Sequence, residues 1–143
     1  MAAPLVQYST RSIQDALLQA TANFANGGSS ASTNAIDLGC AAPWPSTERV
    51  TIQVATTAAV ANTGNAGNIN ISFQHSAVNL AANFVNIPQL GPALLTTTTN
   101  SFVASTTNVQ LPPSVLQFVR CLATTDAGNP STNTGTFTIK ALF

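Results

Sequence analysis

Apolar and polar residues alternate with a period of two in several runs after residue 36. In the clearest run, residues 69 to 74, three apolar side chains fall on one face and three polar side chains on the other. Residues 50–55 and 137–141 alternate in the same way, and 118–123 form a further short, mostly apolar run. A period of two is typical of a β-strand that buries one face and leaves the other in water. The pattern therefore predicts half-buried strands in these segments.

Residues 76 to 100 lack this period, because Pro88, Gly91 and Pro92 interrupt their apolar residues. Proline removes a backbone donor and ends helices, so we expect short strands and a long connection that crosses between two sheets. Two more short strands are expected between 102 and 111. About seven or eight short strands, with turns but no helices between them, predict an all-β fold, an antiparallel β-sandwich of the jelly-roll or Greek-key type.

A helical period occurs only near the start of the chain, where Ile13, Leu17 and Leu18 share one face. Ser12 can cap such a helix, and Asp15 falls where a carboxylate meets the free amides of its first turn. Two turns of helix are too short to be stable alone, so the apolar stripe must pack against this domain or a neighbouring copy.

The segment from 23 to 34 is rich in glycine, serine and asparagine and offers almost nothing to bury, so it is predicted to be a linker. The chain is therefore divided into an N-terminal arm with a short helix and linker, residues 1–30, and a β-sandwich, residues 31–143. The length of 143 residues suits one domain with a real core.

Charged residues make up only 6% of the chain, and the formal net charge is zero. Scattered single bases give no footprint for nucleic acid or an anionic membrane, so neither partner is expected. No apolar run approaches the roughly 20 residues of a membrane helix, and the first residues do not resemble a secretory signal. We expect the protein to be made and used without crossing a membrane. A neutral surface so poor in charge is badly suited to staying monodisperse, which favours a protein that works in contact with others.

The sequence contains little that could support catalysis. Its one histidine, His75, has no neighbouring acid or cysteine motif, and a surface or turn position is the expected interpretation. No local pair of ligands indicates a metal, and no glycine cluster has the context of a phosphate-binding loop, so no cofactor is expected. Cys40 and Cys121 are predicted to be buried small hydrophobes rather than a disulfide. The chain is therefore not expected to be an enzyme.

Three larger side chains have open interpretations. Arg120 lies on a strand and is either outward-facing or paired with an acid such as Asp37 at an interface. Arg49 is either solvated or part of an ion pair between subunits. Trp44, between two prolines, either closes the rim of the sandwich or serves as an aromatic anchor for a partner or a sugar.

Seven segments in a fixed order resemble the capsid cement (decoration) proteins of tailed bacteriophages, the family typified by the cement protein of a Bordetella phage. The resemblance covers residues 31 to 143 and rests on the order and spacing of these segments. They are STNAIDLG at 32–39, RVTIQVAT at 49–56, NINISFQHSA at 68–77, NIP at 86–88, VQLP at 109–112, FVRCLAT at 118–124 and GTFTIKALF at 135–143.

The resemblance implies a jelly-roll protein without enzymatic activity that forms homo-oligomers, dimers or trimers, on the outer face of the phage head. There it would bridge neighbouring subunits of the major capsid protein, after synthesis in the cytoplasm of the host bacterium. We expect the arm to reach an adjacent subunit or the capsid floor. The candidate contact residues are Leu5, Tyr8, Ile13, Leu17 and Leu18 in the arm, with Trp44, Arg49 and Arg120 in the sandwich.

A rival hypothesis makes the chain a carbohydrate- or receptor-binding β-sandwich of a phage spike or fibre. In that case Trp44 or His75 would form the binding platform.

Overall fold

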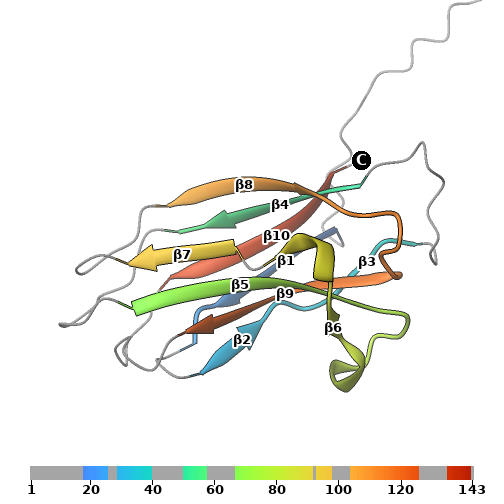
Figure 1. Ribbon diagram of the computed structural model, residues 1–143, viewed down its shortest axis with the longest axis horizontal. Coiled ribbons are helices and arrows are strands. Elements are labelled where there is room, and N and C mark those ends of the chain that lie inside the picture. Colours follow the sequence, from blue (N-terminus) through green and yellow to red (C-terminus); the bar gives the residue numbers. More distant parts are fainter. Residues whose placement is uncertain are drawn as a thin grey trace, which may run out of the picture.

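Two antiparallel sheets packed face to face make up the part of the chain that the computed structural model describes, residues 18–25, 29–39, 50–57, 67–91, 93–97, 104–125 and 135–142 (Figure 1). The first sheet has the order β1 (Gln19–Asn23), β10 (Thr136–Leu142), β4 (Thr51–Thr56), β8 (Ser105–Gln110). In the second sheet, β9 (Phe118–Thr125) pairs with β5 (Gly67–Ser76) at the centre. β2 (Ser30–Ser32) and β3 (Ile36–Asp37) pair with β9, and β6 (Val85–Asn86) and β7 (Ala93–Thr97) pair with β5.

The chain passes from one sheet to the other at almost every step: β1 lies in the first sheet, β2 and β3 in the second, β4 in the first, and β5 to β7 in the second. β8, β9 and β10 then alternate in the same way. This double-sheet, Greek-key order is that of a jelly roll, so the predicted all-β fold is confirmed. Two 3-10 turns, Ala81–Asn83 and Pro88–Leu90, follow β5 and β6.

The strands with the clearest alternation supply the core. Each buries every second side chain between the sheets, as the period of two predicts. The buried residues are Ile52 and Val54 of β4, Ile69, Ile71 and Phe73 of β5, Val119, Cys121 and Ala123 of β9, and Phe137, Ile139 and Ala141 of β10. Because both inner faces are apolar, they close on each other and exclude water.

The predicted arm, residues 1–30, includes strands of the sandwich. Residues 19–23 form β1 and pair with β10 along their whole length, so the expected helix does not continue through them. The predicted boundary at residue 30 falls in β2, which pairs with β9. Backbone pairing and the burial of Ala20 and Phe24 outweigh the helix propensity of alanine here. Residues 1–17 lie outside the described part of the chain.

A buried threonine joins β2 to β3 along the edge of β9. The Cys121 N–H donates to the Thr33 hydroxyl at 3.1 Å, while the Thr33 N–H donates to the Cys121 carbonyl at 3.0 Å. From Ser32 opposite Leu122 to Ile36 opposite Val119, one strand advances one residue more than the other, which marks a bulge. These two hydrogen bonds keep β2 and β3 in a fixed register with β9 on both sides of the bulge.

Cys121 is a free thiol in the core, and burial raises its pKa far above the ordinary value. A thiol that does not ionise is neither a nucleophile nor a metal ligand. The prediction that Cys121 is a buried small hydrophobe is confirmed, and Cys40 lies outside the described residues.

The outer face of the first sheet is polar and almost uncharged. Side chains meet across neighbouring strands, with the Thr21 and Thr138 hydroxyls 2.8 Å apart and the Gln53 amide donating to Asn108 Oδ1 at 3.3 Å. Among the described residues of this face, Lys140 carries the one charge. Threonine suits such positions, because its branched side chain packs on the pleat while the hydroxyl stays in water.

Phe137→Ala tests the core. Phe137 is fully buried, and its ring stacks on Phe24 with 5.0 Å between the ring centroids. Removing the ring should lower the free energy of unfolding by about 3–5 kcal/mol, measured by equilibrium urea denaturation. Thr138→Ala, at the next position on the outer face, is the matched control and should cost no more than about 1 kcal/mol. Equal losses in the two variants would contradict the assignment of the two faces.

Candidate functional site

A lobe of residues 77–87 leaves the sheet after β5 and returns to it through β6. β6 is the strand next to β5 in the second sheet, and Figure 1 shows the 3-10 turn that precedes it projecting from the other strands at the lower right of the view. The lobe sequence AVNLAANFVNI has no charged residue. It is therefore a neutral projection from a jelly roll.

The lobe presents three large apolar side chains to solvent. Val78 is 44% exposed, Leu80 61% and Val85 55%, and these are the exposed large hydrophobic residues of the described chain. Single exposed apolar residues are ordinary, and three within eight positions are a local concentration of them. We call these three side chains the apolar tip.

The opposite side of the lobe is anchored to the sandwich. Ile87 is buried in the main core, and its N–H donates to the Phe73 carbonyl at 2.8 Å. Phe84 is also buried. At the start of the lobe the Val78 N–H donates to the Ser76 hydroxyl at 3.2 Å. The tip is thus held from both ends rather than carried on a free loop.

Arg120 on β9 connects the lobe to the second sheet. Its guanidinium carbon lies 4.2 Å from the centroid of the Phe84 ring, and its Nη2 donates to the Ala81 carbonyl at 3.4 Å. Its Nε donates to Gln74 Oε1 at 2.8 Å. A cation over an aromatic face contributes about 0.5–2 kcal/mol, and a hydrogen bond from a charged group about 1.5–3 kcal/mol. Arg120 is therefore the main polar contact between β9 and the lobe.

Gln74 connects Arg120 to β6 through hydrogen bonds. Its position on β5 is opposite Arg120 on β9 and opposite Asn86 on β6. Its carbonyl oxygen accepts from Arg120, and its amide nitrogen donates to Asn86 Oδ1 at 3.0 Å. Burial of this amide on the outer face of the sheet is tolerated because both ends are hydrogen-bonded. The row Arg120–Gln74–Asn86 spans three strands.

The structure shows how Arg120 lies within one copy of the chain. Arg120 faces outward on β9, and no carboxylate pairs with it among the described residues. Asp37 has other partners, because its Oδ1 accepts from the Gln117 amide at 3.0 Å and from the Gly39 N–H at 2.8 Å. Partial burial lowers the pKa of Arg120 from its ordinary value. An arginine still stays protonated at neutral pH.

His75 takes part in the framework of the sandwich. Its Nδ1 accepts a hydrogen bond from the Leu116 N–H at 3.2 Å, which ties the end of β5 to the turn before β9. The ring is half-buried, and desolvation lowers the pKa of His75 below its ordinary 6.5. The neutral ring is the form that accepts this bond.

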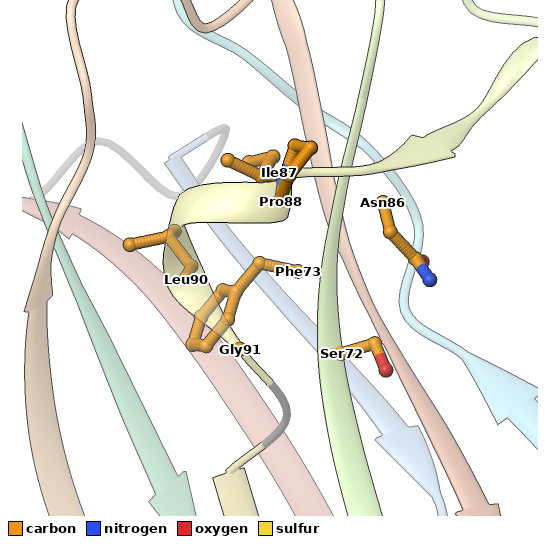
Figure 2. A pocket seen from close by; sticks show the side chains of 7 residues that line it. All are labelled: Ser72, Phe73, Asn86, Ile87, Pro88, Leu90 and Gly91. Atoms are coloured by element: carbon orange, nitrogen blue, oxygen red, sulfur yellow. The ribbon is translucent and has the colours of Figure 1, made fainter.

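A pocket of about 160 Å³ lies between β5 and the return of the lobe. It occurs where residues 88–91 leave the ladder between β6 and β7. Figure 2 shows the side chains of Ser72 and Asn86 on one side and those of Phe73 and Leu90 on the other. The lining residues are Ser72, Phe73, Asn86, Ile87, Pro88, Leu90 and Gly91, none of which titrates near neutral pH.

The described residues contain no group of three or more potential metal ligands. Nor does any helix among them have the length and apolar character needed to cross a membrane.

The structure brings together few of the residues singled out from the sequence. Arg120 lies at the lobe, and Leu18 is half-buried and packs against the core of its own sandwich. The remaining candidates, Leu5, Tyr8, Ile13, Leu17, Trp44 and Arg49, lie outside the described residues. Sequence patterns did not single out the apolar tip or Gln74, although the uncharged run at 77–87 was a usable signal.

No family model matches the chain, and no curated protein sequence is similar to it. Among solved structures the chain is similar to a "Family 16 Carbohydrate Binding Module-2", at 11% identity and a TM-score of 0.34. The match covers 82% of this chain and 71% of that one. A likeness at this level carries no functional argument.

Replacing Arg120 tests the attachment of the lobe. Arg120→Ala removes the contacts with Phe84, Gln74 and Ala81, so hydrogen exchange of the Asn83 and Ile87 amides should quicken by about tenfold or more. Arg120→Lys keeps the charge but not the planar fork that bonds Gln74, so it should restore only part of the protection. Lys140→Ala, on the other sheet, is the control and should leave these amides unchanged. Unchanged exchange in Arg120→Ala would show that Arg120 does not hold the lobe.

His75 makes a pH dependence predictable. Because burial lowers the pKa of His75 in the folded state, the unfolded chain binds the proton more readily. Stability should therefore be full above the unfolded pKa of 6.5 and fall as the pH drops below it. The native protein should melt at a lower temperature at pH 5.5 than at pH 7.5, while His75→Gln should lose most of that difference. A native melting temperature that does not change over this interval would contradict the assignment.

Proposed function

We propose that this chain is a capsid cement (decoration) protein of a tailed bacteriophage. It binds the outer surface of the mature head and stabilises it by bridging neighbouring subunits of the major capsid protein. The observation that carries the proposal is the apolar tip, displayed on a neutral lobe that Arg120 fixes to a jelly roll. The ordered resemblance of residues 31–143 to cement proteins supports it from the sequence.

The low charge of the surface favours contact with another protein. Four basic and four acidic residues share 8490 Å² of accessible surface. Few ions must lose water when such a surface is covered, so the desolvation cost is small. The threonine and amide side chains of the first sheet can exchange water for modest hydrogen bonds across a polar interface.

Each lobe contributes a weak contact. Full burial of a valine or leucine side chain gives about 1.5–3 kcal/mol, and the tip residues are about half exposed, so each adds on the order of 1 kcal/mol. Many copies on one shell, or several lobes in one homo-oligomer, multiply this through effective concentration. A ligand that fits the expanded lattice better than the precursor stabilises the expanded state.

This role includes no catalytic step and no cofactor. It places the protein on the virion after synthesis in the host cytoplasm. Of the two platform residues of the rival hypothesis, His75 is engaged with Leu116, and Trp44 lies outside the described residues.

Heads of the encoding phage that lack the protein provide the test. Added native protein should bind them at a fixed ratio and raise the temperature at which they release DNA. Leu80→Ser combined with Val85→Ser should weaken binding by about tenfold or more, because the tip loses most of its apolar surface.

The matched control is Leu80→Met combined with Val85→Ile, which keeps the tip apolar and should bind like the native protein. Equal heat resistance of heads with and without the protein would refute the proposal. Binding of glycans by the isolated protein, without binding to heads, would favour the rival hypothesis instead.

A further inference from the structure

β8 forms an edge of the first sheet. It pairs with β4 over six consecutive residues, from Thr51 opposite Gln110 to Thr56 opposite Ser105. Among the described residues no strand pairs with its other side. Every residue of β8 except the half-buried Val109 is exposed. Figure 1 shows β8 as the outermost strand of its layer.

Three of the usual protections against edge pairing, namely charge, proline and a bulge, are missing from β8 itself. The β8 sequence STTNVQ contains no charged residue and no proline, and its register with β4 runs without a bulge. The edges of the second sheet, in contrast, are broken between β2 and β3 and between β6 and β7. β8 is also longer than β1, at the opposite edge of its own sheet.

The register identifies the backbone groups that point outward. The Leu111 N–H donates to the Val50 carbonyl at 2.9 Å, so the residues of β8 in phase with Leu111 direct their N–H and C=O toward β4. The alternate residues Thr106 and Asn108 direct theirs to the free edge. Their side chains lie on the polar outer face, together with Gln53.

We infer that two copies of the chain pair antiparallel through β8, about a two-fold axis at Thr107. Thr106 of each copy then lies opposite Asn108 of the other, and the two residue pairs exchange about four backbone hydrogen bonds. The two four-stranded first sheets become one continuous sheet. The inference deepens the self-association in the proposed function, but it does not depend on binding to a capsid.

A second copy is the occupant that the charges favour. An antiparallel edge is self-complementary across a two-fold axis, so the same five residues, 105 to 109, serve both partners. Lys140, the charge on the outer face, lies two strands from the edge. In the pair the two lysines are about five strand spacings or ~24 Å apart, beyond the Debye length of ~8 Å. No like charges therefore oppose the contact.

A pair of charge variants tests the register as well as the edge. Thr106→Lys with Asn108→Lys places like charges opposite each other and should weaken dimerisation by about a hundredfold or more. Thr106→Lys with Asn108→Asp introduces charges at the same positions, but each lysine then faces an aspartate of the second copy. This variant should remain dimeric. Sedimentation velocity over a range of concentrations gives the oligomeric state.

Both variants change exposed positions, so their circular dichroism and melting temperature should match the native fold and exclude unfolding as the cause. The inference is overturned if the native protein is monomeric at the highest concentration reached, or if the double-lysine variant stays dimeric. It is also overturned if the lysine–aspartate variant dissociates as readily as the double-lysine variant. A monomer that still decorates heads would remove this interface and leave the proposed function standing.

Discussion

The alternation of side chains across each strand is the constraint on which the rest of this structure depends. On β9 it sends Val119, Cys121 and Ala123 into the core and leaves Arg120 on the outer face. Closure of the two apolar faces supplies the main driving force, since the chain has too few charges for ion pairs to contribute much. The same closure leaves every second position facing outward, and many of these positions hold threonine, asparagine or glutamine, with Arg120 on one sheet and Lys140 on the other.

From that outward position Arg120 organises the projecting lobe. The guanidinium stacks on Phe84 and bonds the Gln74 amide, whose other end holds Asn86. A lobe held in this way loses less conformational entropy on binding than a mobile loop would, so its small apolar surface is used efficiently. The β8 edge lies on the other sheet and belongs to a separate surface. One protein can therefore use the lobe for a larger partner and the edge for a second copy of itself.

Much of the fold was predictable because the alternation of apolar and polar residues can be seen within single short segments. The strands around Ile52, Ile71 and Ile139 show a period of two within a few residues, and the pattern holds in the structure. β1 was not predicted, because its buried side chain is the small Ala20, whose propensity favours a helix until pairing with β10 overrides it. The contact between Arg120 and Gln74 was not predictable, because the two residues are 46 positions apart in the sequence and meet only through the β5–β9 register. The apolar tip was not predicted, because it lies in a segment whose prolines and glycine indicate a connection between strands.

The central claim is that this jelly roll works as a layer on a phage head, with its neutral lobe against the shell. A reconstruction of purified mature heads, at a resolution that separates strands, tests it most directly. The account predicts density for the sandwich on the outer surface, with residues 77–87 in contact with the major capsid protein. Heads without the chain, or a bound chain whose lobe points into solvent, would contradict it.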